Sequence, residues 1–168
     1  MHSFTSCLIH CVWSTKNREP YLSVELRDRL WRYLGGIAKQ NQMKALAIGG
    51  AGDHVHILLA LPPTLSLSKA MQLLKANSSK WIRETFPKMG SFAWQEGYGA
   101  FSIGASGIEA TTAYIRNQAE HHRRRSFREE FMTMLHRHGF DYDKSMLDWT
   151  ILPSLPGLSK LSDLQAQR

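Results

Sequence analysis

Apolar positions along the chain predict four strands. Residues 3–13 (SFTSCLIHCVW) are mostly apolar, aromatic or β-branched at both odd and even positions, which is typical of a strand covered on both faces. Two more apolar runs, residues 43–49 and 54–61, are separated by a glycine-rich stretch, and we interpret them as a hairpin. Residues 91–103 also have strand character, and the two glycines within them indicate a bulge or a close backbone approach.

The helical spacing of apolar residues predicts four helices. Over residues 24–40 and 67–85 apolar side chains recur every three or four positions, and a serine precedes each segment as an N-cap. Ser-x-x-Glu capping boxes open two further helices, which we expect over about residues 106–122 and 126–139. The order β-α-β-β-α-β-α-α does not alternate strictly, which argues against a doubly wound parallel sheet. We expect an α+β fold in which helices pack on an antiparallel sheet.

The length of 168 residues corresponds to one domain. We place that domain over residues 1–149, and expect residues 150–168, where the pattern fades into proline, serine and leucine, to form a loosely ordered C-terminal tail. No apolar run approaches the roughly 18 to 20 residues of a membrane span, and the N-terminus lacks the pattern of a secretory signal. Cys7 and Cys11 would lie about 13 Å apart on a strand, which is too far for a disulfide, so we expect free thiols and a cytoplasmic location. Because the chain lacks a membrane span, we expect no membrane partner.

The charge of the chain favours an anionic partner. There are 21 Lys and Arg against 14 Asp and Glu, a formal net charge of +7, and nucleic acid is the commonest partner of such a protein. Arginine is concentrated in one segment, at Arg116, Arg123, Arg124, Arg125 and Arg128. We interpret this segment as a grip on a phosphate backbone, with a merely solvated helix face as the alternative.

Two His-x-His pairs differ in what they can bind. His54 and His56 lie in a predicted strand, where residues two apart share a face about 6.5 Å apart and can converge on one cation. His136 and His138 lie at the end of a predicted helix, where a two-residue step of about 200° separates the rings. The strand pair is therefore the candidate metal site. Its alternative is a pair of polar residues on an exposed strand face, and a metal would need a third ligand from elsewhere.

Tyr114 and Gln118 are four residues apart on a predicted helix and share one of its faces. Gln118 offers an amide oxygen, which is a suitable ligand for Mg²⁺ or Mn²⁺, and Tyr114 offers a phenol that can act as a nucleophile. Taken alone, a tyrosine in this position is more often a packing residue and a glutamine more often a surface residue. Asp53 is a candidate for orienting a neighbouring histidine, or else a turn residue.

Three other residues are weaker candidates. Tyr98 is a possible nucleophile, but it has no ligand-type residue four positions on. His10 lies in the first predicted strand, and we assign it to the core or the sheet face, with a role in the site as the alternative. Trp94 is assigned to the core, with stacking on a nucleic-acid base as the alternative.

Three motifs together resemble the single-tyrosine HUH transposases, small enzymes encoded by one class of bacterial insertion sequences, with relatives tied to repetitive extragenic palindromes. The motifs are DHVHILLAL over residues 53–61, Trp-x-x-Gly-Tyr over 94–98 and Tyr-x-x-x-Gln over 114–118. The likeness covers about residues 3–140. His-x-His alone is a weak signal, but the ordered set is fairly specific. The residues after Asn117 lack the Asn-Pro form of the palindrome-linked relatives, which favours an insertion-sequence enzyme.

The resemblance implies a ferredoxin-like sheet, similar to that of RNA-recognition modules, with the histidine pair on a central strand. It implies that His54, His56 and Gln118 bind a divalent metal ion (Mg²⁺ or Mn²⁺) and that Tyr114 is the nucleophile. It further implies cleavage and rejoining of single-stranded DNA, with hairpins at the transposon ends, through a 5′-phosphotyrosine. A homodimer, with sites commonly shared between subunits, would supply two tyrosines.

Two other functions remain open from the sequence. A catalytically inactive or domesticated relative would bind DNA hairpins or structured RNA without cutting them. A hydrolytic phosphoesterase would use the strand histidines with water as the nucleophile. The histidine-triad hydrolases of that kind read His-x-His-x-His, and Leu58 occupies the third position here.

Overall fold

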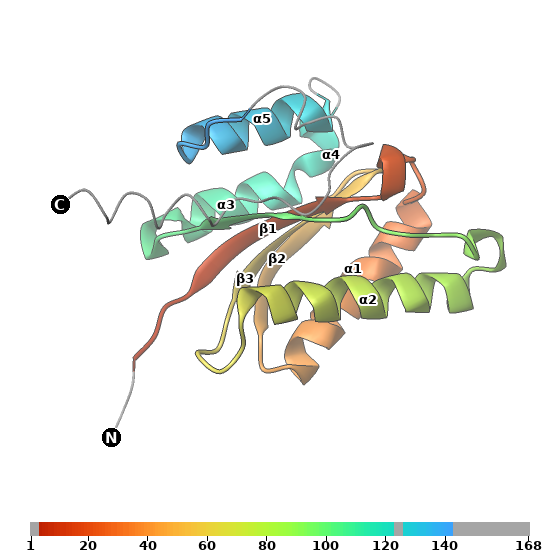
Figure 1. Cartoon of the computed structure of the whole chain (residues 1–168), viewed down its shortest axis with the longest axis horizontal. Coiled ribbons are helices and arrows are strands. Elements are labelled where there is room, and N and C mark those ends of the chain that lie inside the picture. The colour runs from red at the N-terminus through yellow and green to blue at the C-terminus, as the bar shows by residue number, and fades with distance from the viewer. Residues whose placement is uncertain (1–3, 123–125, 143–168) are drawn as a thin grey trace, which may run out of the picture.

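The computed structural model describes residues 4–122 and 126–142, which form a four-stranded antiparallel sheet with helices on both faces (Figure 1). The strands are β1 (Leu8–Ser14), β2 (Lys44–Gly50), β3 (His54–Ala60) and β4 (Gly99–Ser102). The α-helices are α1 (Val24–Gln40), α2 (Leu67–Thr85), α3 (Ile108–Arg116), α4 (Gln118–His121) and α5 (Phe127–Arg137). Short 3-10 helices in the connections are η1 (Lys16–Arg18), η2 (Pro87–Met89) and η3 (Ala105–Gly107).

The strand order is β2-β3-β1-β4, and each neighbouring pair is antiparallel. α1 connects β1 to β2 and α2 connects β3 to β4, and both helices cover the same face (Figure 1). This is the ferredoxin-like arrangement, so the predicted α+β class is confirmed. Since β1 and β3 are the central strands, the histidines of β3 lie in the interior of the sheet and not at its edge.

The face under α1 and α2 carries the main hydrophobic core. Val55, Ile57 and Leu59 of β3 point to this face, because alternate residues of a strand face the same side. The two helices contribute a continuous set of buried apolar side chains, formed by Leu26, Leu30, Leu34, Ile37, Ala70, Met71, Leu74 and Ile82. Burial of each large one is worth about 1.5–3 kcal/mol, so this face supplies a large hydrophobic contribution to stability.

Both of these helices have the predicted bounds. The hydroxyl of Ser23 accepts a hydrogen bond from the backbone N–H of Leu26, and the hydroxyl of Ser66 accepts one from that of Lys69. These bonds satisfy two of the N–H groups that a helix start leaves unpaired. The predictions over 24–40 and 67–85 are therefore confirmed.

The opposite face is covered by α3 and α5 (Figure 1). Ile115 of α3 packs on Leu58 of β3, and Phe131 of α5 packs with Val12 and Phe101 of β1 and β4. These are two small apolar clusters rather than one continuous core. The space between them is left to polar side chains.

Two glycines let these helices approach the sheet closely. A Cβ at Gly49, which pairs with His56 in the sheet register, would lie 2.1 Å from the backbone oxygen of Ile115. A Cβ at Gly99 would lie 2.6 Å from the ring of Phe131. The close backbone approach that the sequence indicated is thus present at β4, where α5 crosses it.

The predicted strand over 91–103 is wrong over most of its length, because only Gly99–Ser102 is a strand. The ammonium group of Lys75 donates to the backbone oxygens of Gln95 and Gly97, at 2.7 and 2.6 Å. Gly97 also has a φ of 76°, which lies outside the extended region. A side chain from α2 therefore takes the backbone acceptors that a longer strand would use.

The predicted helix over 106–122 is interrupted. Ser106 lies inside η3, and the N-cap of α3 is Gly107, which is already helical in conformation, so the serine forms no capping bond. Asn117 (φ −93°, ψ 15°) ends α3, and a short second helix, α4, begins at Gln118. Asparagine favours such breaks because its side chain competes with the helical backbone.

The capping box of α5 is confirmed. The hydroxyl of Ser126 accepts from the N–H of Glu129, and the Glu129 carboxylate accepts from the N–H of Ser126.

The predicted tail over 150–168 and the three arginines at 123–125 lie outside the described residues. Cys7 and Cys11 are free thiols, as predicted. None of the helices within 4–122 and 126–142 has the length and apolarity needed to cross a membrane.

Candidate active site

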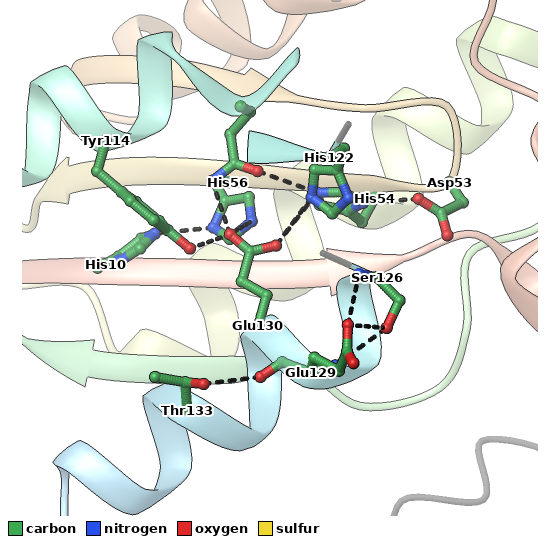
Figure 2. A network of polar contacts seen from close by, with 11 residues as sticks. His10, Asp53, His54, His56, Tyr114, His122, Ser126, Glu129, Glu130 and Thr133 are labelled. Carbon is green, nitrogen blue, oxygen red and sulfur yellow. Dashed lines mark hydrogen bonds and ion pairs between the residues drawn. The ribbon is translucent and has the colours of Figure 1, made fainter. Parts of the chain in front are cut away.

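The two histidines of β3 lie side by side under α3 and α5. His54 and His56 are fully buried, with ring centroids 5.1 Å apart. Nδ1 of His54 lies 2.7 Å from Oδ1 of Asp53, and Nδ1 of His56 lies 2.9 Å from Nε2 of His10. Each ring therefore has Nδ1 engaged by a neighbour and turns Nε2 toward a carboxylate of α5, that of Glu130 (Figure 2).

The partners of these rings fix where their protons lie. Burial lowers the pKa of His56 well below its ordinary value and lowers the pKa of His10 to about 3, and neighbouring imidazoles add to both shifts. Burial acts to raise the pKa of Asp53, but the hydrogen bond and charge of His54 outweigh it, and the pKa is lowered. The ionised Asp53 thus accepts a hydrogen bond from Nδ1–H of His54, as the sequence suggested, and the neutral form of this ring then carries its lone pair on Nε2.

Gln118 brings an oxygen to that lone pair. Its amide nitrogen donates to Oε1 of Glu130 at 2.8 Å, which leaves its Oε1 facing Nε2 of His54 at 3.4 Å. When Nδ1 of His54 carries the proton, the lone pairs of its Nε2 and of the Gln118 oxygen face each other with no hydrogen between them. Nε2 of His56 is a buried atom with no hydrogen-bond partner among the described residues. A cation in this space would satisfy all three atoms, so the residues present fit a divalent metal ion.

Glu130 is the residue that sequence reasoning missed. Its carboxylate is buried, and it accepts hydrogen bonds from the hydroxyl of Tyr114 and from Nε2 of His122, the latter at 2.9 Å (Figure 2). Burial raises its pKa to about 7, against the opposing charge of His54. His54, His122 and Glu130 offer ligand atoms within 4.8 Å of one another.

A signal for Glu130 was present in the sequence. Phe127, Glu130, Phe131 and Met134 recur at helical spacing and are all buried, so the glutamate occupies a position of the apolar stripe. A charged residue at such a position needs a partner in the interior. Its place within a Glu-Glu pair after a capping box masks this signal, because acidic residues are common in a first helical turn.

Tyr114 reaches the same cluster from α3. Its half-buried ring lies edge-on to the rings of His10 and His56, at centroid distances of 6.0 and 5.8 Å. It borders a cavity of about 620 Å³, lined also by Thr111, Thr133, Met134 and Arg137. The break at Asn117 does not separate the tyrosine from Gln118, because both side chains meet at Glu130. One chain therefore supplies the tyrosine and both histidines to one site.

The remaining candidates lie elsewhere. Arg116 is exposed at the end of α3, and Arg128 is half-buried on α5. Trp94 is buried in the main core, where its indole N–H donates to Ser78. Tyr98 packs against that same core, on the opposite face of the sheet from the histidines. His136 and His138, which we excluded as a metal site, are both exposed at the end of α5.

Comparison with known proteins identifies the family and supports the fold. The family model described as "Transposase IS200 like" matches residues 3–118, which include β1 to α3 and all three motifs. The chain belongs to the IS200-like transposase family. Transposases for the insertion sequence element IS200 from Salmonella typhimurium and Salmonella typhi are each 27% identical to it over 124 residues, covering 71% of this chain and 81% of theirs.

Two solved structures have the same fold as this IS200-like transposase. A Deinococcus radiodurans structure described as a transposase is 27% identical, with a TM-score of 0.56, over 70% of this chain and 95% of its own. A REP-associated tyrosine transposase bound to a REP hairpin is 14% identical, with a TM-score of 0.55, over 73% of this chain and 72% of its own. The family and the architecture implied by the sequence motifs are thus confirmed.

Proposed function

We propose that this IS200-like transposase is a metal-dependent enzyme that cleaves and rejoins single-stranded DNA through a 5′-phosphotyrosine on Tyr114. The observation that carries the proposal is that the Tyr114 hydroxyl and Nε2 of the buried His56 both lie against Oε1 of Glu130, beside an open cavity. A phenol is a competent nucleophile once it is positioned next to charge-stabilising groups.

The phenol oxygen of Tyr114 attacks the scissile phosphorus. The oxygen–phosphorus bond forms as the bond from phosphorus to O3′ breaks, the phenol proton is released, and the departing 3′ oxygen takes up a proton. One DNA end is then linked to the protein through its 5′ phosphate, and the other ends in a 3′ hydroxyl. Because the phosphotyrosine conserves the free energy of the phosphodiester, a second 3′ hydroxyl can reverse the step without an energy cofactor.

His54, His56 and Gln118 would hold the divalent cation, Mg²⁺ or Mn²⁺, through the two Nε2 atoms and the amide oxygen. When bound, the ion neutralises charge on a phosphate oxygen in the transition state. Asp53 and His10 keep the two rings oriented by engaging their Nδ1 atoms.

The proposed substrate is single-stranded DNA with hairpins at the transposon ends. The net charge of +7 and the exposed Arg116 support an anionic partner, as does the arginine run that follows in the sequence. The REP hairpin held by the structural neighbour favours a folded single strand over a duplex. A homodimer is proposed because one Tyr114 cannot hold two cleaved ends at once.

A denaturing gel tests the proposal. The purified chain is incubated with Mn²⁺ and a labelled single-stranded hairpin oligonucleotide, and protein-linked DNA is measured. We expect an adduct with the wild type and with Tyr98→Phe, whose ring lies on the other face of the sheet. We expect none with Tyr114→Phe or after addition of EDTA.

The same gel separates the other two functions. Binding without any cleavage by the wild type would indicate a hairpin-binding module. Cleavage that continues in Tyr114→Phe and leaves no adduct would indicate a hydrolase that uses water. Either result would overturn the proposal.

A further inference from the structure

α5 contributes to the site although the family match ends before it. The match stops at residue 118, and α5 begins at Phe127. The ring of Phe127 stacks on the ring of His54, with centroids 4.4 Å apart and planes 17° apart, so α5 is packed directly on the histidine pair. One turn further on, Glu130 points its carboxylate into the polar cluster (Figure 2).

The two oxygens of Glu130 have separate partners. Oε1 accepts hydrogen bonds from the Tyr114 hydroxyl and the Gln118 amide, and lies 3.5 Å from Nε2 of His56. Oε2 lies 2.9 Å from Nε2 of His122 and 3.9 Å from Nε2 of His54. One carboxylate therefore touches the nucleophile and both sides of the histidine pair.

Among the described residues, no lysine or arginine balances the charge of this carboxylate. In the part of the chain that the structure describes, all ion-pair partners of Glu130 are histidines, and none is lysine or arginine. A buried carboxylate among neutral dipoles is costly unless a cation lies next to it. The neighbouring Nε2 of His56, buried and without a hydrogen bond among the described residues, is a second atom that requires a partner in the same space.

We infer that Glu130 is a further ligand of the divalent cation and that it also positions the Tyr114 hydroxyl beside that cation. The inference rests on the proposed function and adds a residue from outside the matched family segment. A carboxylate oxygen is the preferred donor for Mg²⁺ and Mn²⁺, and it would join the two imidazoles and the amide of Gln118. Since one side chain contacts both groups, cation binding and alignment of the nucleophile depend on α5.

Mn²⁺ binding without DNA tests the ligand role. The full chain, stripped of metal, is titrated with Mn²⁺ and followed by the EPR signal of the free ion. Glu130→Gln keeps the side-chain shape and removes the charge, and we expect its affinity for Mn²⁺ to fall by at least about 10-fold. The matched control is Glu129→Gln, one residue away, which turns toward Ser126 and can keep its capping bond as glutamine. Its affinity should equal that of the wild type.

The outcomes separate this inference from the proposed function. Equal Mn²⁺ affinity of Glu130→Gln and wild type overturns the ligand role, while an adduct by the wild type keeps the proposed function. A wild type that binds no Mn²⁺ and forms no adduct overturns both. If Glu130→Gln does not fold, Glu130→Ala, which removes the carboxylate, takes its place, and an affinity equal to wild type contradicts the ligand role.

The positioning role has its own readout. At saturating Mn²⁺, Glu130→Ala should still form the adduct about 10-fold or more slowly, because Tyr114 has lost the acceptor of its hydroxyl. A return to the wild-type rate at saturating Mn²⁺ would show that Glu130 acts on the cation alone.

Discussion

The two faces of the sheet are made by the same strands and differ completely in chemistry. On β3, Val55 and Ile57 enter an apolar core under α1 and α2, whereas His54 and His56 enter a polar cluster under α3 and α5. The first face is a continuous apolar layer, and the second is two small apolar clusters with titratable groups between them. Alternate residues of β3 therefore serve either stability or chemistry. Substitution of a residue on the apolar face should lower stability, and substitution of its neighbour on the polar face should lower activity.

His56→Ala should give the largest effect on activity. It removes a proposed ligand, and we expect adduct formation to fall by more than about 100-fold, because even supporting residues of metal sites are worth 10- to 100-fold. Binding of the hairpin oligonucleotide, measured by gel shift, should be largely retained. Equal loss of binding and cleavage would assign His56 a structural role instead.

Ile57→Ala, one residue further along β3, should reverse this pattern. Its side chain is fully buried in the main core, and we expect the free energy of unfolding to fall by about 2–5 kcal/mol. Urea denaturation measures the change. The protein that remains folded should form the adduct at the wild-type rate, and a smaller loss of stability than in His56→Ala would contradict the division between the faces.

Asp53→Ala should have an intermediate effect on the polar face. The carboxylate orients His54 through Nδ1, and its removal should weaken Mn²⁺ binding by about 10- to 100-fold. Asp28→Ala, an exposed aspartate on α1, is the matched control and should bind Mn²⁺ as the wild type does. Unchanged affinity in Asp53→Ala would mean that the burial of His54 alone fixes its orientation.

Ser126→Ala should give the smallest effect. It removes the cap of α5 and should lower the free energy of unfolding by about 1 kcal/mol. Because α5 carries Glu130, Mn²⁺ affinity should fall slightly as well. Ser79→Ala within α2 should be neutral or stabilising, since alanine is the better helix former. A Ser126→Ala protein as stable as wild type would show that packing, not capping, holds α5.

The bounds of α1 and α2 could be predicted from the sequence because residues within each helix determine them. α1 and α2 combine a capping serine with an uninterrupted apolar stripe, and the predicted bounds match the structure. β4 and the start of α3 were mispredicted because distant or backbone effects decide them. Lys75 comes from a helix 20 residues away in sequence to bind the carbonyl of Gln95, and no pattern within residues 91–103 reports it.

The site divides in the same way. The alternation of β3 places His54 and His56 on one face, and the spacing of Tyr114 and Gln118 brings them to one cluster even though the helix between them is broken. The spacing on α5 marks Glu130 as an inward-facing residue, but it does not tell which groups the carboxylate meets, because that depends on how α5 crosses the sheet at Gly99. The packing of α5 on β4 joins segments that are distant in sequence, and neither segment contains a motif that predicts the contact.

Gly49 sets the distance across which the nucleophile can act. Because Gly49 has no side chain, the backbone of Ile115, the residue after Tyr114, packs directly on β2 at the position that pairs with His56. A single methyl group there would push α3 outward while the apolar core on the other face stayed intact. The activity of the site would then depend on a residue that has no side chain and takes no part in the chemistry itself.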